Sequence, residues 1–531
     1  MILKLPEIPD SEQTPLIKGL LSIIEQLADQ NQKLKEEVSI LKDDIRVLKG
    51  EKKRPKFKAS KLDQKTNDET KKKSKKKQRA NKKELTIHVE AIIKPDNIPQ
   101  GSRFKGYQDF TVQDLVIKPK NTRYRLERWL TPEGKILTGT LPDSLEHRHY
   151  GPNIVTYLLY QHHHCQVTQP LLLEQLREWG IIISSGQLDR LLTTNKERFH
   201  KEKDDLLEVG LAQSSYVTVD DSGARHKGKN GYVTHIGNDF FAWFSSTAKK
   251  SRANFLSLLQ GKKTVYFLCE DAFEYMLTRK LPALQIEKLK ALTELEYSDE
   301  DSWQELLESI DITSIHHVRS ATEGALMGAL LKDNNLDHLA IISDGAGQFN
   351  ILQHGLCWVH AERLIHTMIP LNEKHREDIK TVRGKIWELY KGLKQYKLSP
   401  EKQEAKRLSE QFDNIFSQKT SYEILNQCLR RLAKLKEKLL LVLKRPDVPL
   451  HTNGSESDIR DYVKKRKVSG GTRSDLGQKC RDTFISLKKT CRKLNISFWE
   501  YLSDRHNEQK MPLLSEIVKI RLTSLNTATG L

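Results

Sequence analysis

The sequence has no long apolar run. Its uninterrupted apolar stretches reach only five residues, as in Phe240–Phe244 and Leu439–Leu443, in a chain of 531, whereas a membrane-spanning helix needs about 18. The N-terminus also lacks the charged region followed by an apolar region that a secretory signal requires. These absences exclude a membrane channel and predict a cytoplasmic protein without a membrane partner.

Cysteine is scarce, and two informative motifs are missing. The six cysteines include no Cys-x-x-Cys pair, which excludes a disulfide-rich secreted scaffold and a four-cysteine zinc site. No Gly-x-x-x-x-Gly-Lys-Ser/Thr motif occurs, so ATP-driven chemistry is not indicated. Apolar residues make up only 37% of the chain, so part of it is expected to lie outside any hydrophobic core.

Positive charge is abundant. The chain has 89 Lys and Arg against 70 Asp and Glu, a net charge of +19, which predicts a polyanionic partner such as nucleic acid. Residues 51–83 hold 16 of the basic residues and only 4 acids. A segment of this composition buries too little apolar surface to fold. We expect a disordered basic linker, acting either as a spacer or as an arm that binds DNA phosphates.

A heptad pattern precedes this linker and predicts a coiled coil over residues 1–50. Asn31 is the single polar residue of the seam, and a buried Asn favours a parallel, two-stranded register. We therefore expect a homo-oligomer, with a helix packed on its own domain as the alternative. The seam consists of Ile17, Leu20, Ile24, Leu27, Asn31, Leu34, Val38, Leu41, Ile45 and Leu48.

The next two segments predict small modules. Residues 84–145 are strand-like and turn-rich, which indicates a small β-rich module. Residues 146–210 become helical: one helix ends at Gly180, and another begins behind the capping candidates Ser184 and Ser185. This order fits a helix-turn-helix that contacts DNA, and it also fits an ordinary two-helix corner.

The remaining chain predicts an α/β core interrupted by helices. Three short strands from Ser215 onward indicate a β-meander, with a helix near Ser251–Leu259 and a later buried strand ending at Asp344. We expect the first part of the core at 211–361, with an insertion at 260–338, and then an α-helical insertion at 362–450. A catalytic helix with C-terminal helices is expected at 451–504, followed by a C-terminal tail at 505–531. The helical insertion is predicted from an apolar stripe at Val382, Ile386, Leu389 and Leu393.

Three acids in this core are candidate metal ligands. Asp220 and Asp344 each follow a predicted strand, and Glu456 lies in the first turn of a predicted helix. Each has an ordinary alternative role: a turn residue or helix cap for the aspartates, and N-terminal helix capping with Asn453 for the glutamate. Together they match the hard oxygen ligands of two-metal phosphoryl transfer. This arrangement predicts an RNase H-like fold.

Four sequence blocks around these acids resemble the bacterial DDE transposases of the insertion-sequence-66 family, the large transposase product of that element. The resemblance covers most of the chain. It rests on VDDSGARHKGKNGY with Asp220, SDGAGQF with Asp344, GLCWVHAER with Cys357 and His360, and HTNGSESDIRDYVKKRK with Asn453 and Glu456.

The resemblance implies an enzyme that cleaves the 3′ ends of an insertion sequence and transfers them to target DNA. Asp220, Asp344 and Glu456 would be both catalytic residues and ligands of Mg²⁺, with Mn²⁺ as a substitute. It also implies double-stranded DNA as substrate, possible accessory proteins of the same element, and a nucleoid-associated location in a bacterium. Cys357, His360 and Asn453 would be accessory residues near the site.

The chain departs from the family pattern at three places. The stretch RWLTPEGKILTGTLP, where the family often has a cysteine-rich zinc-binding element, contains no cysteine. The block after the first strand has Asp221 where the family has Glu, and Ser222 where it has Thr. These differences make zinc binding doubtful and leave Asp220 in place.

A basic run follows Glu456 on the same predicted helix, and we expect it to bind DNA phosphates; a solvated helix face is the alternative. The run consists of Arg460, Lys464, Lys465, Arg466 and Lys467.

Two other functions of the protein would use the same candidate residues. One is a transposase-derived DNA-binding protein without turnover, and the other is a two-metal nuclease specific for DNA structure.

Overall fold

The computed structural model describes six segments of the chain. The predicted coiled coil at 1–50 and the basic linker at 51–83 lie outside them. The chain divides into two units, residues 1–111 and 112–531, and the elements below belong to the second. The described residues are 86–142, 149–261, 263–293, 295–334, 336–507 and 510–529.

The predicted β-rich module at 84–145 is only a hairpin in its described part. Strand β1 (Arg128–Leu130) pairs antiparallel with β2 (Ile136–Thr138), and residues 86–127 contain no strand. The strand-like segments TIHVEAII at 86–93 and FTVQDLVIKP at 110–119 form no strands. Their apolar residues are exposed, as Val89 and Val116 show with 82% and 76% of their surface accessible. The alternation predicts a strand, but within the described residues no neighbouring strand or layer pairs with it.

Helices follow as predicted from residue 152 onward. Ser184 Oγ accepts a hydrogen bond from the backbone N–H of Gln187, which confirms it as a helix cap. Gly180 has φ +76°, and the preceding helix ends two residues before it. The elements are α2 (Pro152–Leu159), the π-helical turn η3 (Tyr160–His164), α3 (Gln169–Glu178), α4 (Ser185–Thr193) and α5 (Glu197–Gln213).

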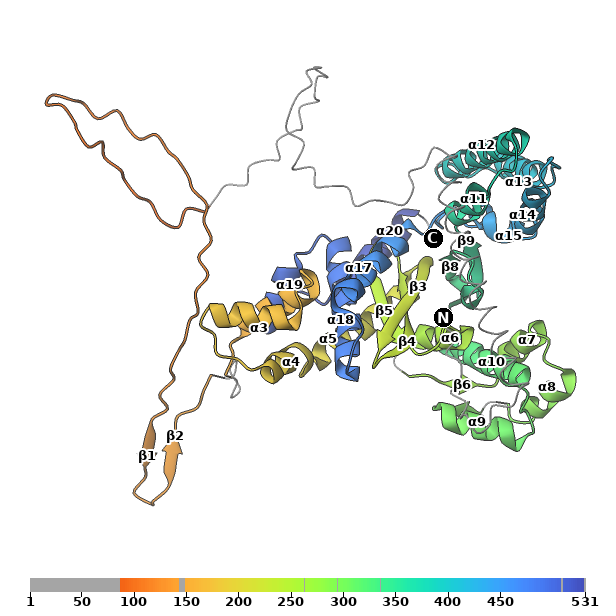
Figure 1. The fold of residues 1–531 in the computed structure, drawn as a ribbon. Coiled ribbons are helices and arrows are strands. Elements are labelled where there is room, and N and C mark those ends of the chain that lie inside the picture. The colour runs from red at the N-terminus through yellow and green to blue at the C-terminus, as the bar shows by residue number, and fades with distance from the viewer. Residues whose placement is uncertain are drawn as a thin grey trace, which may run out of the picture. The chain divides into compact units, whose positions relative to one another are not determined.

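A five-stranded mixed sheet forms the centre of the second unit (Figure 1). The predicted meander is confirmed, because β3, β4 and β5 pair antiparallel in sequence order. Strands β8 and β9 then extend the sheet parallel to β3. The strand order is β5-β4-β3-β8-β9. The strands are β3 (Tyr216–His226), β4 (Lys229–Gly237), β5 (Ala242–Thr247), β8 (Ala340–Ser343) and β9 (Gln353–Leu356).

The segment between β5 and β8 is mostly helical, as expected. Ser251 caps α6 through a hydrogen bond from the Asn254 backbone N–H. A short strand pair supports the helices, and its Tyr266 stacks on the buried Trp303 with ring centroids 5.3 Å apart. The elements are α6 (Arg252–Gln260), β6 (Tyr266–Phe267), α7 (Glu270–Thr278), α8 (Ala283–Lys290), β7 (Glu296–Tyr297), α9 (Glu300–Ser309), α10 (Ile315–Asn334) and the 3₁₀ turns η4 (Leu336–His338) and η5 (Gly347–Phe349).

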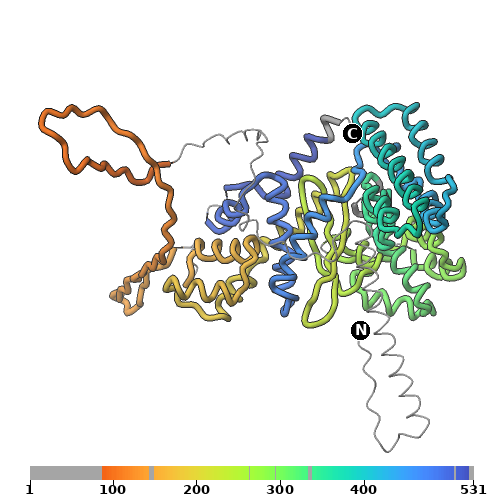
Figure 2. The backbone as a smooth tube through the Cα atoms, turned by 45° about the horizontal axis from the view of Figure 1, so that its top comes forward, coloured from red at the N-terminus to blue at the C-terminus, as the bar shows by residue number. Residues whose placement is uncertain are grey.

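Helices between β9 and residue 450 share a second hydrophobic cluster. The predicted stripe of Val382, Ile386, Leu389 and Leu393 is buried on one face of α12. Trp358, the first residue of α11, donates a hydrogen bond from its indole nitrogen to the carbonyl of Leu439 in α15, at 2.8 Å. Figure 2 shows these helices running alongside one another. They are α11 (Trp358–His366), α12 (Glu373–Tyr396), α13 (Lys402–Phe416), α14 (Glu423–Ala433), α15 (Lys436–Leu439) and α16 (Leu441–Lys444).

Four helices form the C-terminal part of the described chain: α17 (Asn453–Ser469), α18 (Asp475–Lys493), α19 (Phe498–His506) and α20 (Leu514–Thr529). Helices α17 and α18 pack on the sheet, whereas α19 packs on α2 and α20 packs on α5. Helix α18 covers the free edge of β5, whose backbone N–H groups at Ala242, Phe244 and Ser246 donate to side chains of this helix. An edge strand covered in this way cannot pair with another chain. The predicted tail at 505–531 contains α20, which buries Leu514 and Val518 in the main core.

Candidate active site

Two of the candidate acids lie at the same level of neighbouring parallel strands. In the register of β3 and β8, Thr218 is opposite Ile342, and Asp220 and Asp344 each come two residues later. Asp344 follows the last residue of β8, as expected. Asp220 does not end its strand, because β3 continues to His226 before it reverses at Lys227 and Gly228.

Glu456 reaches the same region from α17. It lies in the first turn, where its backbone N–H donates to the Thr452 carbonyl at 3.1 Å. Asn453 is the first residue of the helix, and the N-cap position belongs to Thr452, which makes no side-chain capping bond. The capping role of Asn453, considered from the sequence, is therefore not present.

The charges of the three acids interact. Burial raises the pKa of Asp220 from its ordinary value of 3.8 to about 6, against the lowering effect of a hydrogen bond from the Asp221 backbone N–H. The negative charges of Asp344, Asp221 and Glu456 raise this pKa further. Like charges shift one another's pKa only at short range. The fold therefore brings together acids that are 124 and 112 residues apart in the sequence.

One oxygen of Glu456 is unsatisfied. Its Oε1 is buried and has no hydrogen-bond partner among the described residues. His360 Nε2 lies 3.6 Å from Oε1, beyond hydrogen-bond distance. Buried polar atoms in folded proteins nearly always have a partner, so an orphaned carboxylate oxygen in an acidic cluster is the feature expected of a cation ligand.

Asp221 differs from its neighbour because its charge is compensated. Lys250 Nζ lies 2.8 Å from one carboxylate oxygen, and Gln348 Nε2 donates to the other at 2.6 Å. These two partners could not be found from the sequence, because they come from the loop before α6 and from the turn η5. Their effect is to leave Asp220, and not Asp221, as the uncompensated carboxylate of this strand.

Cys357 and His360 lie directly beside the acids. The Cys357 backbone N–H donates to the carbonyl of Ser343, the residue before Asp344, at 2.9 Å. Burial raises the pKa of the Cys357 thiol, but hydrogen bonds involving His360 and Thr452 outweigh burial, so the net shift is downward. The same bond to Cys357 raises the pKa of His360, although burial opposes it.

The described residues contain no group of three or more His, Cys, Asp or Glu side chains that is already arranged around one metal position. The donor set still fits a divalent cation on two grounds. Carboxylate oxygens are the ligands that Mg²⁺ prefers. The cluster contains an orphaned oxygen of Glu456, and the pKa of Asp220 is raised by burial and then further by its neighbours' negative charge.

The predicted basic run divides between two faces of α17. Arg460, Lys464 and Lys467 are exposed, and helical spacing places them on the face that begins with Glu456. Lys465 is buried and donates to the His162 carbonyl at 2.7 Å. Arg466 is half-buried and donates to the Gly223 carbonyl of β3. Lys465, which we expected to bind DNA phosphates together with the other four residues, therefore lies on the opposite side of the helix from Arg460, Lys464 and Lys467.

The mixed sheet and the acids at its centre are consistent with a DDE transposase-like domain. The sequence model of the Transposase IS66 family matches residues 315–480. This range includes Asp344, His360 and Glu456, and it does not reach Asp220.

A curated relative gives a longer match. "Uncharacterized protein y4jO" of Sinorhizobium fredii (strain NBRC 101917 / NGR234) is 42% identical over 302 residues, which covers 56% of this chain and 94% of the relative. The chain belongs to the Transposase IS66 family, as the resemblance predicted. No solved structure matches it. Among the described residues, no helix is long and apolar enough to cross a membrane.

Proposed function

We propose that this chain is a DDE transposase that cuts the 3′ ends of an insertion sequence and joins them to target DNA. The observation that carries this proposal is the convergence of Asp220, Asp344 and Glu456, whose negative charges raise the pKa of Asp220. Membership of a transposase family adds DNA as the substrate.

The strand order supports an RNase H-like core. An antiparallel meander is followed by two parallel strands on the far side of its first strand, so that the first acid is central and the second lies on the adjacent strand. The helices between β9 and α17 then have the place of an α-helical insertion before the third acid. The predicted domain limits remain proposals.

Asp220, Asp344 and Glu456 would hold Mg²⁺. When bound, Mg²⁺ supplies positive charge that activates the attacking oxygen and stabilises the leaving 3′ oxygen. Asp220 contributes from a rigid central strand, while Lys250 and Gln348 keep Asp221 engaged. His360 lies near the Glu456 carboxylate and is itself bonded to Cys357, which is anchored behind Asp344.

The exposed cations of α17 would bind the DNA backbone. Arg460, Lys464 and Lys467 lie on the same helix face as Glu456, so a strand whose phosphates contact them would pass the acids. Phosphate contacts of this kind fix the position of DNA without reading its sequence. The coiled coil at 1–50 and the linker at 51–83 would add dimerisation and a further, sequence-independent contact.

The test compares single substitutions in the full chain. Asp220→Asn, Asp344→Asn and Glu456→Gln each keep the side-chain shape and remove the charge that holds Mg²⁺. Cleavage and strand transfer are measured on duplexes with element ends in MgCl₂, and DNA binding is measured separately in EDTA. Glu410→Gln, on an exposed face of α13, is the matched control.

We expect the three variants to lose cleavage and keep DNA binding, and the control to keep both. Near-normal strand transfer by any one variant would remove that residue from the site. Wild-type protein that binds element ends and never cuts them would instead support the DNA-binding protein without turnover. Cleavage that never proceeds to joining would support the structure-specific nuclease.

A further inference from the structure

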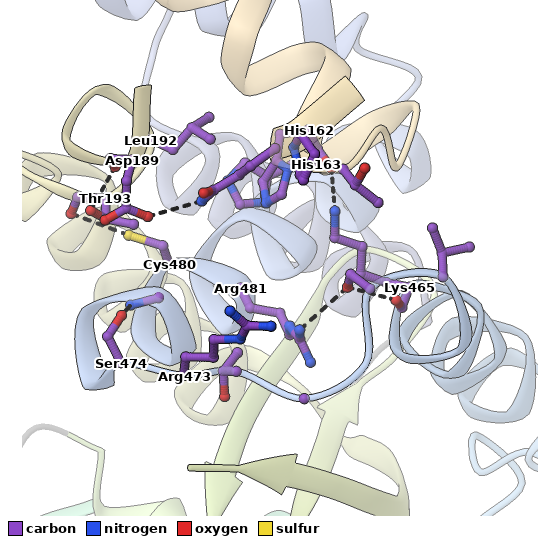
Figure 3. A pocket seen from close by; sticks show the side chains of 18 residues that line it. His162, His163, Asp189, Leu192, Thr193, Lys465, Arg473, Ser474, Cys480 and Arg481 are labelled. Atoms are coloured by element: carbon purple, nitrogen blue, oxygen red, sulfur yellow. Dashed lines mark hydrogen bonds between the residues drawn. The ribbon is translucent and has the colours of Figure 1, made fainter. Parts of the chain in front are cut away.

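A cavity lies away from the acidic cluster, where η3, α3 and α4 meet the end of α17 and the start of α18. Its volume is about 470 Å³, which falls within the range of small-molecule sites. Figure 3 shows His162 and His163 on one side of this cavity, with Lys465, Arg473 and Arg481 around the remainder.

Two cations in the wall are buried without a countercharge. Lys465 and Arg481 are only 7% and 8% exposed, and no carboxylate forms an ion pair with either in the described part of the chain. Lys465 donates to the His162 carbonyl, and Arg481 makes long contacts, at 3.4 Å, to the Gly470 carbonyl. Buried charges are normally paired, so the wall lacks an anion.

The surrounding groups increase this positive character. Arg473 is exposed at the rim, and the 19-residue helix α18 begins at the cavity, with Ser474 as its cap. The one acid of the described lining is Asp189, whose Oδ1 accepts a hydrogen bond from Gln169 Nε2 at 2.9 Å. Burial, together with the charges of Arg481 and Lys488, lowers the pKa of Lys465 to about 7.

The rest of the wall suits a flat ring. His163 stacks on Phe484 with centroids 4.3 Å apart, and its Nε2 is buried without a hydrogen-bond partner among the described residues. Pro170, Leu192 and Val468 add apolar surface. Nucleobases bind to surfaces of this kind by stacking, while an adjacent cation holds the phosphate.

We propose that this cavity binds one unpaired nucleotide of DNA, with its phosphate at Lys465, Arg473 and Arg481 and its base against the histidine side. The cavity is too small for a duplex, so the nucleotide must be unpaired. That the nucleotide belongs to DNA rests on the proposed function, whereas the inference that the cavity binds a phosphate rests on its lining residues alone. A free mononucleotide has the same chemistry and is distinguished by the test.

The test uses the full chain in EDTA, so that no strand is cut. Binding is measured by fluorescence anisotropy with a blunt duplex and with the same duplex carrying one unpaired, 5′-phosphorylated nucleotide. A parallel measurement records the thermal midpoint with and without dAMP. The variants are Arg473→Gln at the rim and Lys465→Met in the wall, with Arg431→Gln, an exposed arginine on α14, as the control of equal charge change.

We expect wild type to bind the overhang duplex about tenfold more tightly than the blunt duplex, as for one charge-assisted contact. Arg473→Gln should remove this preference and change blunt-duplex binding less than about twofold. Arg431→Gln should keep the preference. Lys465→Met should also lose the preference for the overhang duplex. If Lys465→Met fails to fold, the result for Arg473→Gln alone decides whether the proposal holds.

Equal affinity of wild type for both duplexes, without a dAMP effect on the midpoint, would overturn the proposal. If dAMP raises the thermal midpoint and wild type binds both duplexes equally, the cavity binds a free mononucleotide. That result would overturn the proposal that it binds a nucleotide of DNA. If wild type binds no DNA, the proposed function fails, and the dAMP measurement still decides whether the cavity binds a nucleotide.

Discussion

The uncompensated charge of Asp220 has a consequence for stability. Its pKa is about 6 in the folded protein against 3.8 ordinarily, so the folded state binds more protons than the unfolded state between these values. Stability from this group therefore falls as the pH rises from about 4 to 6. A shift of roughly two pKa units corresponds to about 3 kcal/mol, which partial exposure reduces to about 1–3 kcal/mol.

Replacing Asp220 with Asn should consequently stabilise the metal-free protein at neutral pH. The amide oxygen still accepts the hydrogen bond from the Asp221 backbone N–H, while the like-charge repulsion disappears. For a unit of 420 residues, 112–531, a change of about 1–3 kcal/mol should raise the thermal midpoint in EDTA at pH 7.5 by about 1–3 °C. The difference between variant and wild type should shrink as the pH falls toward 4, because the Asp220 carboxyl is then protonated in the folded state and its negative charge is lost.

Scanning calorimetry across pH 4–7.5, with and without MgCl₂, measures both parts of this prediction. Added Mg²⁺ should raise the midpoint of wild type and leave Asp220→Asn unchanged, because a ligand stabilises only the state that binds it. Glu410→Gln serves as the control for the loss of one exposed carboxylate. A midpoint of Asp220→Asn that equals or falls below that of wild type in EDTA would refute the reasoning.

Three further predictions use other parts of the chain. Arg505→Met should lower the free energy of unfolding by about 3–5 kcal/mol in urea titrations, because it leaves the buried Glu202 carboxylate without its ion pair at 2.9 Å; no change would show that the pair is dispensable. Lys464→Gln with Lys467→Gln should reduce the slope of log affinity against log salt by roughly 0.9 per lost phosphate contact, and an unchanged slope would remove this face from the DNA interface. Deletion of residues 51–83 should reduce the same slope for every DNA sequence, whereas an intact slope would leave the linker as a spacer.

Local patterns predicted most elements of the core. The meander, the cap at Ser184 and the buried stripe of α12 depend on periodicity and capping within a few residues, and the structure confirms each. The strands expected between residues 85 and 119 failed for the opposite reason. A strand is stabilised by a partner strand or layer, and alternation along one segment does not show whether either exists.

Hydrogen bonds between polar groups that lie far apart in the sequence could not be predicted. Helix α18 carries Asp482, Ser486 and Thr490 at four-residue spacing, which reads as a solvated face. All three are buried, because they accept hydrogen bonds from the backbone N–H groups of the edge strand β5. Lys465 shows the same limit, since a lysine within a basic run gives no sign that it faces a cavity.

Asp458 and Glu456 show how the fold assigns different roles to two acids on one helix. Burial would raise the pKa of Asp458, but His235 at 3.3 Å, Lys493 at 3.0 Å and Lys489 at 3.3 Å hold it below its usual range.

These contacts fasten α17 to β4 and α18 at a point two residues from Glu456, so the third acid is positioned without any bond to its own Oε1. A carboxylate anchored by its own ion pairs would have little affinity left for a cation. With the anchor placed at Asp458, Glu456 is held in place and keeps its charge available.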